Sequence, residues 1–352
     1  TNPQHLIYHS RTYRRGKEWT MTLMVIKTLE RVSKNYYYII RGVLNMIRLF
    51  ASDMDGTLLN DKGYISDRTI NAVKKLQKHG IHFIVNTGRD YHAAKRELDA
   101  ASLSCDMICH SGACTYDVHG NGFHIASLPK SIAKQILTVF ERHGAFADIA
   151  TEYGKTSITD KNTLLSYYKN EVFPAVEQEG KVYFRTWHDF AMMVSKVRFF
   201  EGKESLLGCE TPIYKISTTF FDQDKINALK DDIHGIDQLH AVSTSKNDLE
   251  ITHVNAQKGT ALLRYAQTKK ITPSQILAVG DSGNDLSMLS LDLGVTAAMA
   301  NASATVKDVC SVIAPSNDQD GVAFLIEDIL EQNELAARVR RSFCLALDYS
   351  KI

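Results

Sequence analysis

The sequence predicts an α/β protein in which a doubly wound, parallel sheet is interrupted by a smaller α+β domain. The apolar runs at 49–52, 81–86 and 276–280 have the length and composition of buried parallel strands. Each run ends in polar residues, as is typical of strands whose carboxyl ends form a ligand site. Between 127 and 237 helical and strand-like stretches alternate in another pattern, which indicates a second, inserted domain.

Length and composition exclude several classes of protein. A chain of 352 residues is long enough for two domains. Its formal net charge of +1 argues against a general nucleic-acid binder, which would carry a clustered positive excess. No apolar run reaches the length of about 18 residues that a membrane span needs. The six cysteines contain no Cys-x-x-Cys pair and their spacings do not suit zinc, so we expect reduced thiols and a cytoplasmic location.

The first 45 residues differ from the rest of the chain. They hold eight Lys and Arg against two Asp and Glu, whereas Met46 leads directly into the first predicted strand. A basic, acid-poor segment is also typical of an organelle transit peptide, but such peptides are enriched in Ser and this segment is not. We interpret residues 1–45 as a non-native or disordered leader, from upstream read-through or an incomplete gene model, with the transit peptide as the alternative.

Two carboxylates, Asp53 and Asp55, follow the first predicted strand and precede Gly56. Asp and Gly form turns readily, so a plain strand-ending turn is the alternative interpretation. In an open α/β sheet, however, ligands bind beyond the carboxyl ends of the strands. The position therefore favours a chemical role for both carboxylates.

The second predicted strand ends at Thr87 and Gly88. A capped amphipathic helix between Ser66 and Gly80 separates it from the first strand, so we expect a right-handed parallel crossover. A hydroxyl followed by Gly can donate to a phosphate oxygen while backbone amides of the next helix approach that oxygen. Thr-Gly alone is a weak signal, and its place beside the first strand is what favours the interpretation.

Two further polar groups occur late in the chain. Lys258 begins a predicted helix, where a cation opposes the helix dipole unless an anion is bound nearby. The buried strand at 276–280 runs into Asp281, Asn284 and Asp285. Acids directly after a buried strand again indicate a site at the carboxyl edge of the sheet.

The inserted domain is expected to contain helices at 131–143, 161–168 and 222–233 and strands at 183–187 and 213–219. We expect the chain to return to the first domain with a strand at 249–252. Ordinary surface or core placement is the favoured interpretation of the aromatic and basic residues of this domain, and substrate contact is the alternative. The residues concerned are Arg185, Trp187, His188, Tyr214 and Lys215.

Four stretches together resemble a known family. Residues 53–59, Asp-Met-Asp-Gly-Thr-Leu-Leu, resemble the first motif of the haloacid dehalogenase-like (HAD) hydrolases. Residues 86–89 (Asn-Thr-Gly-Arg), 256–259 (Ala-Gln-Lys-Gly) and 280–285 (Gly-Asp-Ser-Gly-Asn-Asp) resemble the other three motifs in order. The Thr-Gly-Arg form and the insert between the second and third motifs resemble the Cof-type subgroup with a type 2B cap. Ser111 departs from the Asn usual in that subgroup.

The resemblance implies a Rossmann-like, HAD-like core and an inserted α+β cap. The expected core comprises 46–126 and 238–330 and the cap 127–237, with a helical tail at 331–352. The resemblance also implies that Asp53 is the nucleophile, that Asp55 is the acid and base, and that Lys258 neutralises the phosphoryl group. The implied phosphate-binding residues are Thr87, Gly88, Lys258 and Asn284. The implied Mg²⁺ ligands are Asp53, Asp55 through its main-chain carbonyl, Asp281 and Asp285.

The function implied is that of a Mg²⁺-dependent phosphatase acting on small phosphorylated metabolites through an aspartyl-phosphate. Sugar phosphates and nucleotide-like cofactors such as flavin mononucleotide or pyridoxal phosphate are the expected substrates. A phospholigand sensor and a phosphotransferase are the alternatives on the same fold. We expect a monomer or weak homo-oligomer with no nucleic-acid or membrane partner.

Overall fold

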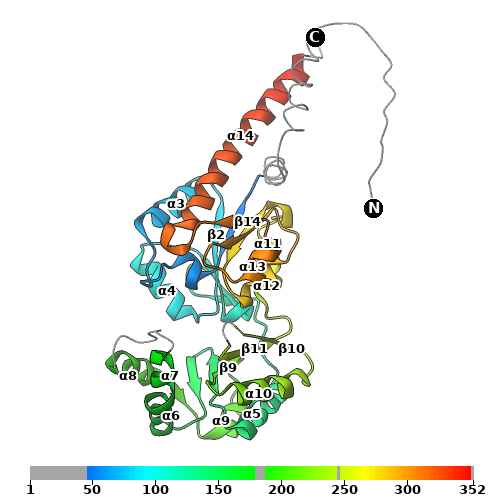
Figure 1. Ribbon diagram of the computed structural model, residues 1–352. Coiled ribbons are helices and arrows are strands. Elements are labelled where there is room, and N and C mark those ends of the chain that lie inside the picture. The colour runs from blue at the N-terminus through cyan, green and yellow to red at the C-terminus, as the bar shows by residue number, and fades with distance from the viewer. Residues whose placement is uncertain (1–45, 179–186, 244–245, 350–352) are drawn as a thin grey trace, which may run out of the picture.

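The structure, a computed structural model, describes residues 46–178, 187–243 and 246–349. Within these residues the strands form two sheets, one of eight strands and one of six. We call them the core sheet and the cap sheet. Figure 1 shows the core sheet and its helices above the cap sheet, with helix α14 extending away from both.

The core sheet has the strand order β14-β13-β12-β1-β2-β3-β4-β5. From β14 to β3 neighbouring strands are parallel, and β4 and β5 add an antiparallel hairpin at one edge. The strands are β1 (Leu49–Ser52), β2 (His82–Asn86), β3 (Asp106–Cys109), β4 (Cys114–Tyr116), β5 (Gly122–Phe123), β12 (Ile276–Gly280), β13 (Val295–Met299) and β14 (Val312–Ala314). The predicted doubly wound α/β core is confirmed, with this antiparallel edge as an addition.

Helices cover both faces of the core sheet, as its continuous apolar strands require. Figure 1 shows α3 (Asp67–Lys78), α4 (Tyr91–Ala100) and α14 (Gly321–Tyr349) on one side. It shows α11 (Lys258–Thr268), α12 (Leu286–Leu289) and α13 (Ala304–Val309) on the other. The described residues also contain short helical turns: η1 (Met54–Leu58), η2 (His110–Gly112), η3 (Tyr168–Val172), η4 (Pro273–Gln275), η5 (Gly283–Asp285) and η6 (Asn317–Gln319).

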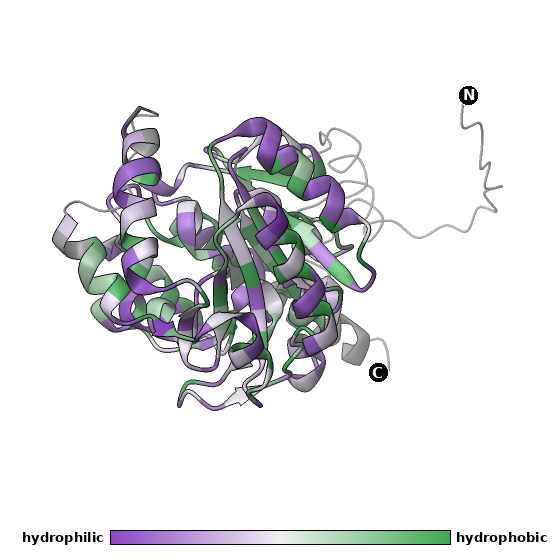
Figure 2. Ribbon diagram, turned by 90° about the horizontal axis from the view of Figure 1, so that it is seen from below, coloured by the Kyte–Doolittle hydropathy of each residue, from purple (hydrophilic) through white to green (hydrophobic). Residues whose placement is uncertain are grey.

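The local sequence explains these elements. Every residue of β1 and β12 is buried, as expected for central parallel strands. Helix α3 begins as predicted, because the Ser66 side chain accepts a hydrogen bond from the Thr69 amide. In the view from below, Figure 2 shows hydrophobic strands at the centre and many hydrophilic residues on the surrounding helices. Within the described residues no helix is both long enough and apolar enough to cross a membrane.

The cap sheet has the strand order β10-β11-β9-β6-β7-β8. Its strands are β6 (Asp148–Thr151), β7 (Gly154–Ser157), β8 (Arg198–Phe199), β9 (Ile213–Thr219), β10 (Leu239–Val242) and β11 (Asp248–His253). Helices α5 (Lys130–His143), α9 (Gly202–Leu207) and α10 (Gln223–His234) contribute to one apolar cluster with Ile149 and Ile216. Helices α6 (Lys161–Tyr167), α7 (Phe173–Gln178) and α8 (Trp187–Ser195) lie at the side of this sheet (Figure 1).

One strand belongs to a different sheet from the one we expected. The stretch 249–252 was expected in the core, but it forms β11 and pairs antiparallel with β9 and β10. Its sequence alternates: Leu249 and Ile251 are buried in the apolar cluster of the cap sheet, whereas Glu250 points to the other face. Such alternation is typical of a sheet with one packed face, whereas the parallel core strands are apolar throughout.

One further expectation is corrected by the structure, and another concerns residues that the structure does not describe. Helix α14 is continuous from Gly321 to Tyr349, so the expected tail starting at 331 continues the last core helix. The predicted strand at 183–187 lies outside the described residues except for Trp187, which begins α8. Arg185 likewise lies outside the described residues.

Candidate active site

Polar residues follow the carboxyl ends of three adjacent strands of the core sheet. Asp53 follows β1, Thr87 follows β2 and Asp281 follows β12. Strand β1 pairs in parallel with both of the others, so their carboxyl ends lie side by side. Helix α11 begins at Lys258, and the Asn86 amide donates a hydrogen bond to the Lys258 carbonyl at 3.0 Å. Residues far apart in the sequence therefore meet at the carboxyl ends of these strands.

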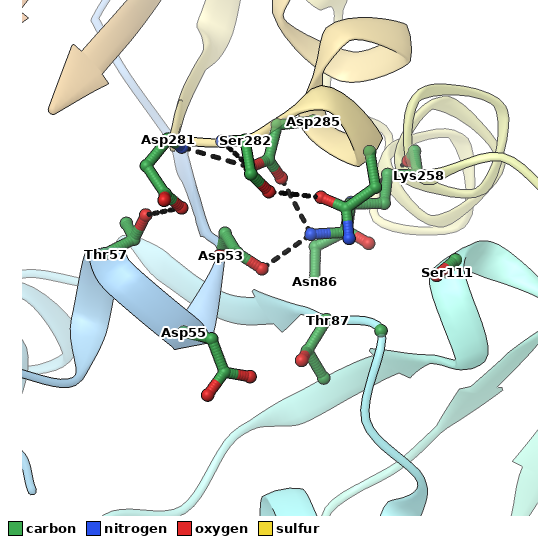
Figure 3. Close-up of polar contacts among 12 residues, drawn as sticks. Asp53, Asp55, Thr57, Asn86, Thr87, Ser111, Lys258, Asp281, Ser282 and Asp285 are labelled. Carbon is green, nitrogen blue, oxygen red and sulfur yellow. Dashed lines mark hydrogen bonds and ion pairs between the residues drawn. The ribbon is translucent and has the colours of Figure 1, made fainter. Parts of the chain in front are cut away.

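Lys258 lies between two carboxylates. Its ammonium Nζ is 2.5 Å from Asp53 Oδ1 and 2.7 Å from Asp285 Oδ1 (Figure 3). The side chains of Lys258 and Asp285 are fully buried, and that of Asp53 is 6% exposed. Burial of charge is stabilising only when the charges are well paired. The ammonium therefore holds two carboxylates in place. Their negative charges offset the unfavourable interaction between a cation and the positive end of the helix dipole at the start of α11.

Burial and charge shift the pKa values of these groups in opposite directions. Burial raises the pKa of Asp53 well above its usual range, and the nearby charges of Asp285 and Asp281 add to the rise while Lys258 opposes it. Burial alone would lower the pKa of Lys258, but the carboxylates of Asp285 and Asp53 raise it instead. The Lys stays charged, and an additional cation beside Asp53 would favour its carboxylate form.

Asp285 orients its neighbours rather than offering a free oxygen. Its Oδ1 accepts from Lys258, and its Oδ2 accepts from the amides of Asp281 and Ser282 at 3.0 and 3.1 Å. Ser282 and Asp285 also form a capping box around the turn η5. One carboxylate oxygen therefore holds the Lys258 ammonium, and the other fixes the loop that carries Asp281.

The carboxylates form a set that fits Mg²⁺. In the part of the chain that the structure describes, oxygen atoms of Asp53, Asp281 and Asp285 lie within 4.8 Å of one another. Burial, with the charge of Asp285, raises the pKa of Asp281 to about 6, and Thr57 donates to its Oδ1 at 3.1 Å. Mg²⁺ prefers carboxylate, carbonyl and water oxygens, so the chemistry of these donors suits it.

Gly56 makes room for this arrangement. It adopts φ +71°, and a Cβ at this position would lie 2.6 Å from Asp281 Oδ2. No real Cβ makes so close a contact, so only Gly permits both the backbone turn and the position of Asp281. The Gly of the Asp-Met-Asp-Gly stretch is thus required both by its positive φ and by the lack of space for a Cβ beside Asp281.

The Asp55 side chain does not join the other carboxylates. It is 60% exposed and forms a bidentate contact with Arg89, with distances of 2.9 and 2.6 Å. Figure 3 shows its carboxylate directed away from the contact between Asp53 and Lys258. The side chain is therefore free of the buried cluster and is exposed to solvent.

Gly88 lies beside Ser111 and Asn284, and Thr87 precedes it at the end of β2. The buried Thr87 hydroxyl accepts from the Arg89 amide at 3.1 Å and retains its own proton to donate. A Cβ on Gly88 would lie 3.3 Å from Ser111 Oγ and 3.6 Å from Asn284 Nδ2. The Asn284 carbonyl oxygen accepts from Ser282, which leaves its amide nitrogen on the Gly88 side. The Asn284 amide group therefore lies beside Gly88, and phosphate binding by these residues stays a prediction.

A family model of haloacid dehalogenase-like hydrolases matches residues 50–326. The chain belongs to this family. It is 28% identical over 288 residues to Phosphatase YwpJ of Bacillus subtilis, a match that covers 81% of this chain and 100% of YwpJ. It is also 28% identical over 295 residues to the 5-amino-6-(5-phospho-D-ribitylamino)uracil phosphatase YwtE of the same organism, covering 81% and 98% of the two chains.

The fold of this HAD-like hydrolase agrees with solved structures of the family. A haloacid dehalogenase-like hydrolase from B. subtilis superimposes with a TM-score of 0.68 at 26% sequence identity, covering 80% of this chain and 99% of the other. The resemblance to Cof-type HAD-like hydrolases is therefore confirmed.

Sequence reasoning missed a contact network between the two sheets of this HAD-like hydrolase. Lys215 Nζ, on β9, donates to the Gly88 carbonyl at 3.0 Å and to Glu250 Oε1 at 2.8 Å. Ser111, on the core side, donates to Glu250 Oε2 at 2.9 Å. Burial by itself would raise the pKa of Glu250, but Lys215 and the other donors lower it, so the carboxylate is charged.

Arg89 and Glu250 were not among the predicted site residues. Arg89 could have been found, since it follows Thr87 and Gly88 directly at the strand end. Glu250 could have been found only if the alternation of 248–252 had been assigned to a half-buried sheet. Among the cap residues for which substrate contact was the alternative interpretation, Tyr214 is buried and stacks on His110 at 4.8 Å, and Trp187 is 46% exposed. The side chain of His188 lies outside the description.

Proposed function

We propose that this chain is a Mg²⁺-dependent phosphatase of small phosphorylated metabolites that works through an aspartyl-phosphate on Asp53. The observation that carries the proposal is the buried contact of Lys258 with Asp53 and Asp285, beside the Asp281 carboxylate. A fixed cation beside a carboxylate at a strand end suits attack on a phosphate dianion. Family membership and the names of the relatives support the same reaction class.

In the first proposed step, an Asp53 carboxylate oxygen attacks phosphorus and the bond from phosphorus to the substrate oxygen breaks. Lys258 lowers the repulsion between carboxylate and phosphate, and Thr87 donates to a phosphate oxygen. Once its side chain turns from Arg89 toward the substrate, Asp55 takes up a proton from solvent and gives it to the leaving oxygen. Mg²⁺, held by Asp53, Asp281 and the Asp55 carbonyl, would supply positive charge for the phosphoryl oxygens.

In the second proposed step, Asp55 is a carboxylate and takes a proton from water. The water oxygen attacks phosphorus, and the bond from phosphorus to Asp53 breaks to release inorganic phosphate. One residue thus acts first as acid and then as base. The exposure of Asp55 on the substrate side is consistent with both steps, because each involves a group that enters from solvent.

We further propose a division of the chain that follows its two sheets. The catalytic core would comprise 46–126 and 254–330, and the cap 127–253. This moves the expected boundary at 237 to the end of β11, because β10 and β11 pair with β9. The cap would then meet the core at Gly88 through Lys215, close to the phosphate.

The proposal is tested by phosphate release from a panel of phosphorylated metabolites, with and without Mg²⁺. The panel includes sugar phosphates, pyridoxal phosphate, flavin mononucleotide and the substrate named for YwtE. We expect Mg²⁺-dependent release that Asp53→Asn abolishes and that the exposed control Asp231→Asn retains. Release that persists in Asp53→Asn, or no release from any compound, would contradict the proposal.

A further inference from the structure

The loop between β13 and α13, residues 300–303, lies beside the proposed metal site. Strand β13 pairs in parallel with β12, so this loop and Asp281 follow the carboxyl ends of neighbouring strands. The Ser303 amide donates a hydrogen bond to the Asp281 carbonyl at 3.1 Å. The loop therefore contacts the backbone of one of the proposed Mg²⁺ ligands.

Asn301 extends the contacts of this loop to the other side of the site. Its side-chain Nδ2 donates to the Gly56 carbonyl at 2.8 Å. Its Oδ1 accepts from the Asn317 amide at 3.1 Å, so both ends of the side-chain amide are engaged. Because Asn301 is an exposed residue, these two hydrogen bonds rather than packing set the direction of its side chain.

The segment that Asn301 contacts is a tight turn. Asp55 has φ −77° and ψ 125°, and Gly56 has φ 71° and ψ 2°. These angles are typical of the two central residues of a type II β-turn, which favours Gly at the second of them. The carbonyl that joins Asp55 to Gly56 is the proposed main-chain ligand of Mg²⁺. Its position therefore depends on how the turn is held.

The turn packs directly against the Asp281 side chain. Thr57 Oγ1 donates to Asp281 Oδ1 at 3.1 Å (Figure 3). A Cβ on Gly56 would lie 2.6 Å from Asp281 Oδ2, so the backbone of the turn lies against the same carboxylate. A shift of the turn would change the separation of the Asp55 carbonyl from this carboxylate. Mg²⁺ tolerates little such change, because it demands nearly ideal octahedral geometry.

Asn317 holds the same turn at a second carbonyl. Its Nδ2 donates to the Leu59 carbonyl at 3.1 Å, and the Leu59 amide donates to the Met54 carbonyl at 2.8 Å. Asn317 is 7% exposed, so it is anchored by packing, and its own amide in turn holds Asn301. The turn is thus attached at Gly56 and at Leu59 to residues from the other end of the chain.

We propose that Asn301 is a positioning residue for the metal site. By holding the Gly56 carbonyl, it fixes the turn so that the Asp55 carbonyl and the Asp281 carboxylate can bind one Mg²⁺. The inference rests on the proposed function and deepens it. Asn301 touches neither the metal nor the substrate and acts through the turn.

Metal affinity without substrate is the first measurement. The melting temperature of the full chain is followed as a function of Mg²⁺ concentration, since a ligand that binds the folded state raises it. Asn301→Ala removes both hydrogen bonds of the side chain. Loss of a residue that orients metal ligands typically costs about 10- to 100-fold in metal affinity, and we expect the Mg²⁺ concentration needed for a given rise to increase by this factor.

The same data separate positioning from a merely structural role. The melting temperature without metal reports the effect of the substitution on the fold alone. Asn170→Ala is the matched control, because Asn170 is also exposed and donates through Nδ2 to Ser166 Oγ at 3.1 Å. It should leave the Mg²⁺ requirement unchanged. An Asn301→Ala protein that melts earlier without metal but needs no more Mg²⁺ than the parent chain would overturn the inference.

A second substitution locates the effect in the turn. Thr57→Val removes the hydrogen bond from the turn to Asp281. Both substitutions loosen the same contact, so the loss of Mg²⁺ affinity in the double variant should be smaller than the product of the two single losses. A loss equal to that product would show that Asn301 acts by another route, which would overturn the inference.

Metal binding also separates this inference from the proposed function. Weaker Mg²⁺ binding by Asn301→Ala would support the positioning role even if the parent chain releases no phosphate, which would refute only the phosphatase. Phosphate release from the metabolite panel with the same Mg²⁺ dependence in Asn301→Ala and the parent chain would refute only the positioning role. A parent chain whose melting temperature does not respond to Mg²⁺ would refute both.

Discussion

Replacing Lys258 with Met tests whether the buried ammonium holds the site together. The variant keeps the volume and unbranched shape of the side chain but removes the charge that contacts Asp53 at 2.5 Å and Asp285 at 2.7 Å. Removing one partner of a buried pair costs about 3–5 kcal/mol, because it leaves an uncompensated buried charge. Since Lys258 serves two carboxylates, we expect a loss near the upper end of that range.

The loss should depend on pH with a definite sign. Without Lys258 the pKa of Asp53 rises further above its unfolded value, because the ammonium is what lowers it. A carboxyl whose pKa is raised in the folded state contributes stability at pH values below its unfolded pKa. That contribution is lost as the pH rises through the folded pKa. The difference between Lys258→Met and the parent chain should therefore be larger at pH 7.5 than at pH 5.5.

Urea unfolding in metal-free buffer measures the effect. Far-UV circular dichroism is the suitable signal, because Trp187 lies in α8 beside the cap sheet and would not report on the core. We expect the midpoint to fall by roughly 1.5 M, from a loss of about 4–5 kcal/mol and a slope of about 3 kcal/mol per M, the upper value that suits a larger chain. Lys225→Met removes an exposed contact and should change stability by less than about 1 kcal/mol. A Lys258→Met loss as small as the control's, or one that grows at pH 5.5, would refute the reasoning.

Two further predictions concern the metal site. Burial and Asp285 raise the folded-state pKa of Asp281 to about 6 from a usual value of 3.8, so the metal-free protein loses stability as the pH rises through this range. Mg²⁺ needs the ionised carboxylates, and a fixed Mg²⁺ concentration should raise the melting temperature more at pH 7.5 than at pH 5.5; calorimetry showing the reverse order would contradict this. Gly56→Ala should cost about 1–3 kcal/mol through its φ of +71° and should raise the Mg²⁺ concentration needed for half-maximal phosphate release by displacing Asp281. Unchanged Mg²⁺ dependence in a folded Gly56→Ala protein would argue against this role of the glycine.

The sequence predicted the core fold and the positions of its polar strand ends. Continuous apolar runs predicted central parallel strands, and the polar residues after them were therefore expected at the carboxyl ends of those strands. Asp53, Thr87 and Asp281 lie there as expected. The positions of these residues could be predicted from the sequence, because each position depends only on the strand that the residue follows.

Pairings between distant segments were decided by the tertiary structure. Glu250 was expected in a core strand, yet it contacts Lys215 within the cap sheet and accepts a hydrogen bond from Ser111 of the core. The contact of Asp55 with Arg89 likewise depends on how the loops after β1 and β2 face each other.

The sequence by itself determined the fold class, the order of the four motifs and the types of residue at the sheet edge. Only the tertiary structure decided which charges are paired and what lies opposite the proposed phosphate site. The cavity that Asp148, Phe173 and Thr219 line is the clearest case, because these residues come from separate elements whose packing brings them together. Strand periodicity is a local property of the chain, whereas the shape of a cavity depends on side chains that no local pattern brings together.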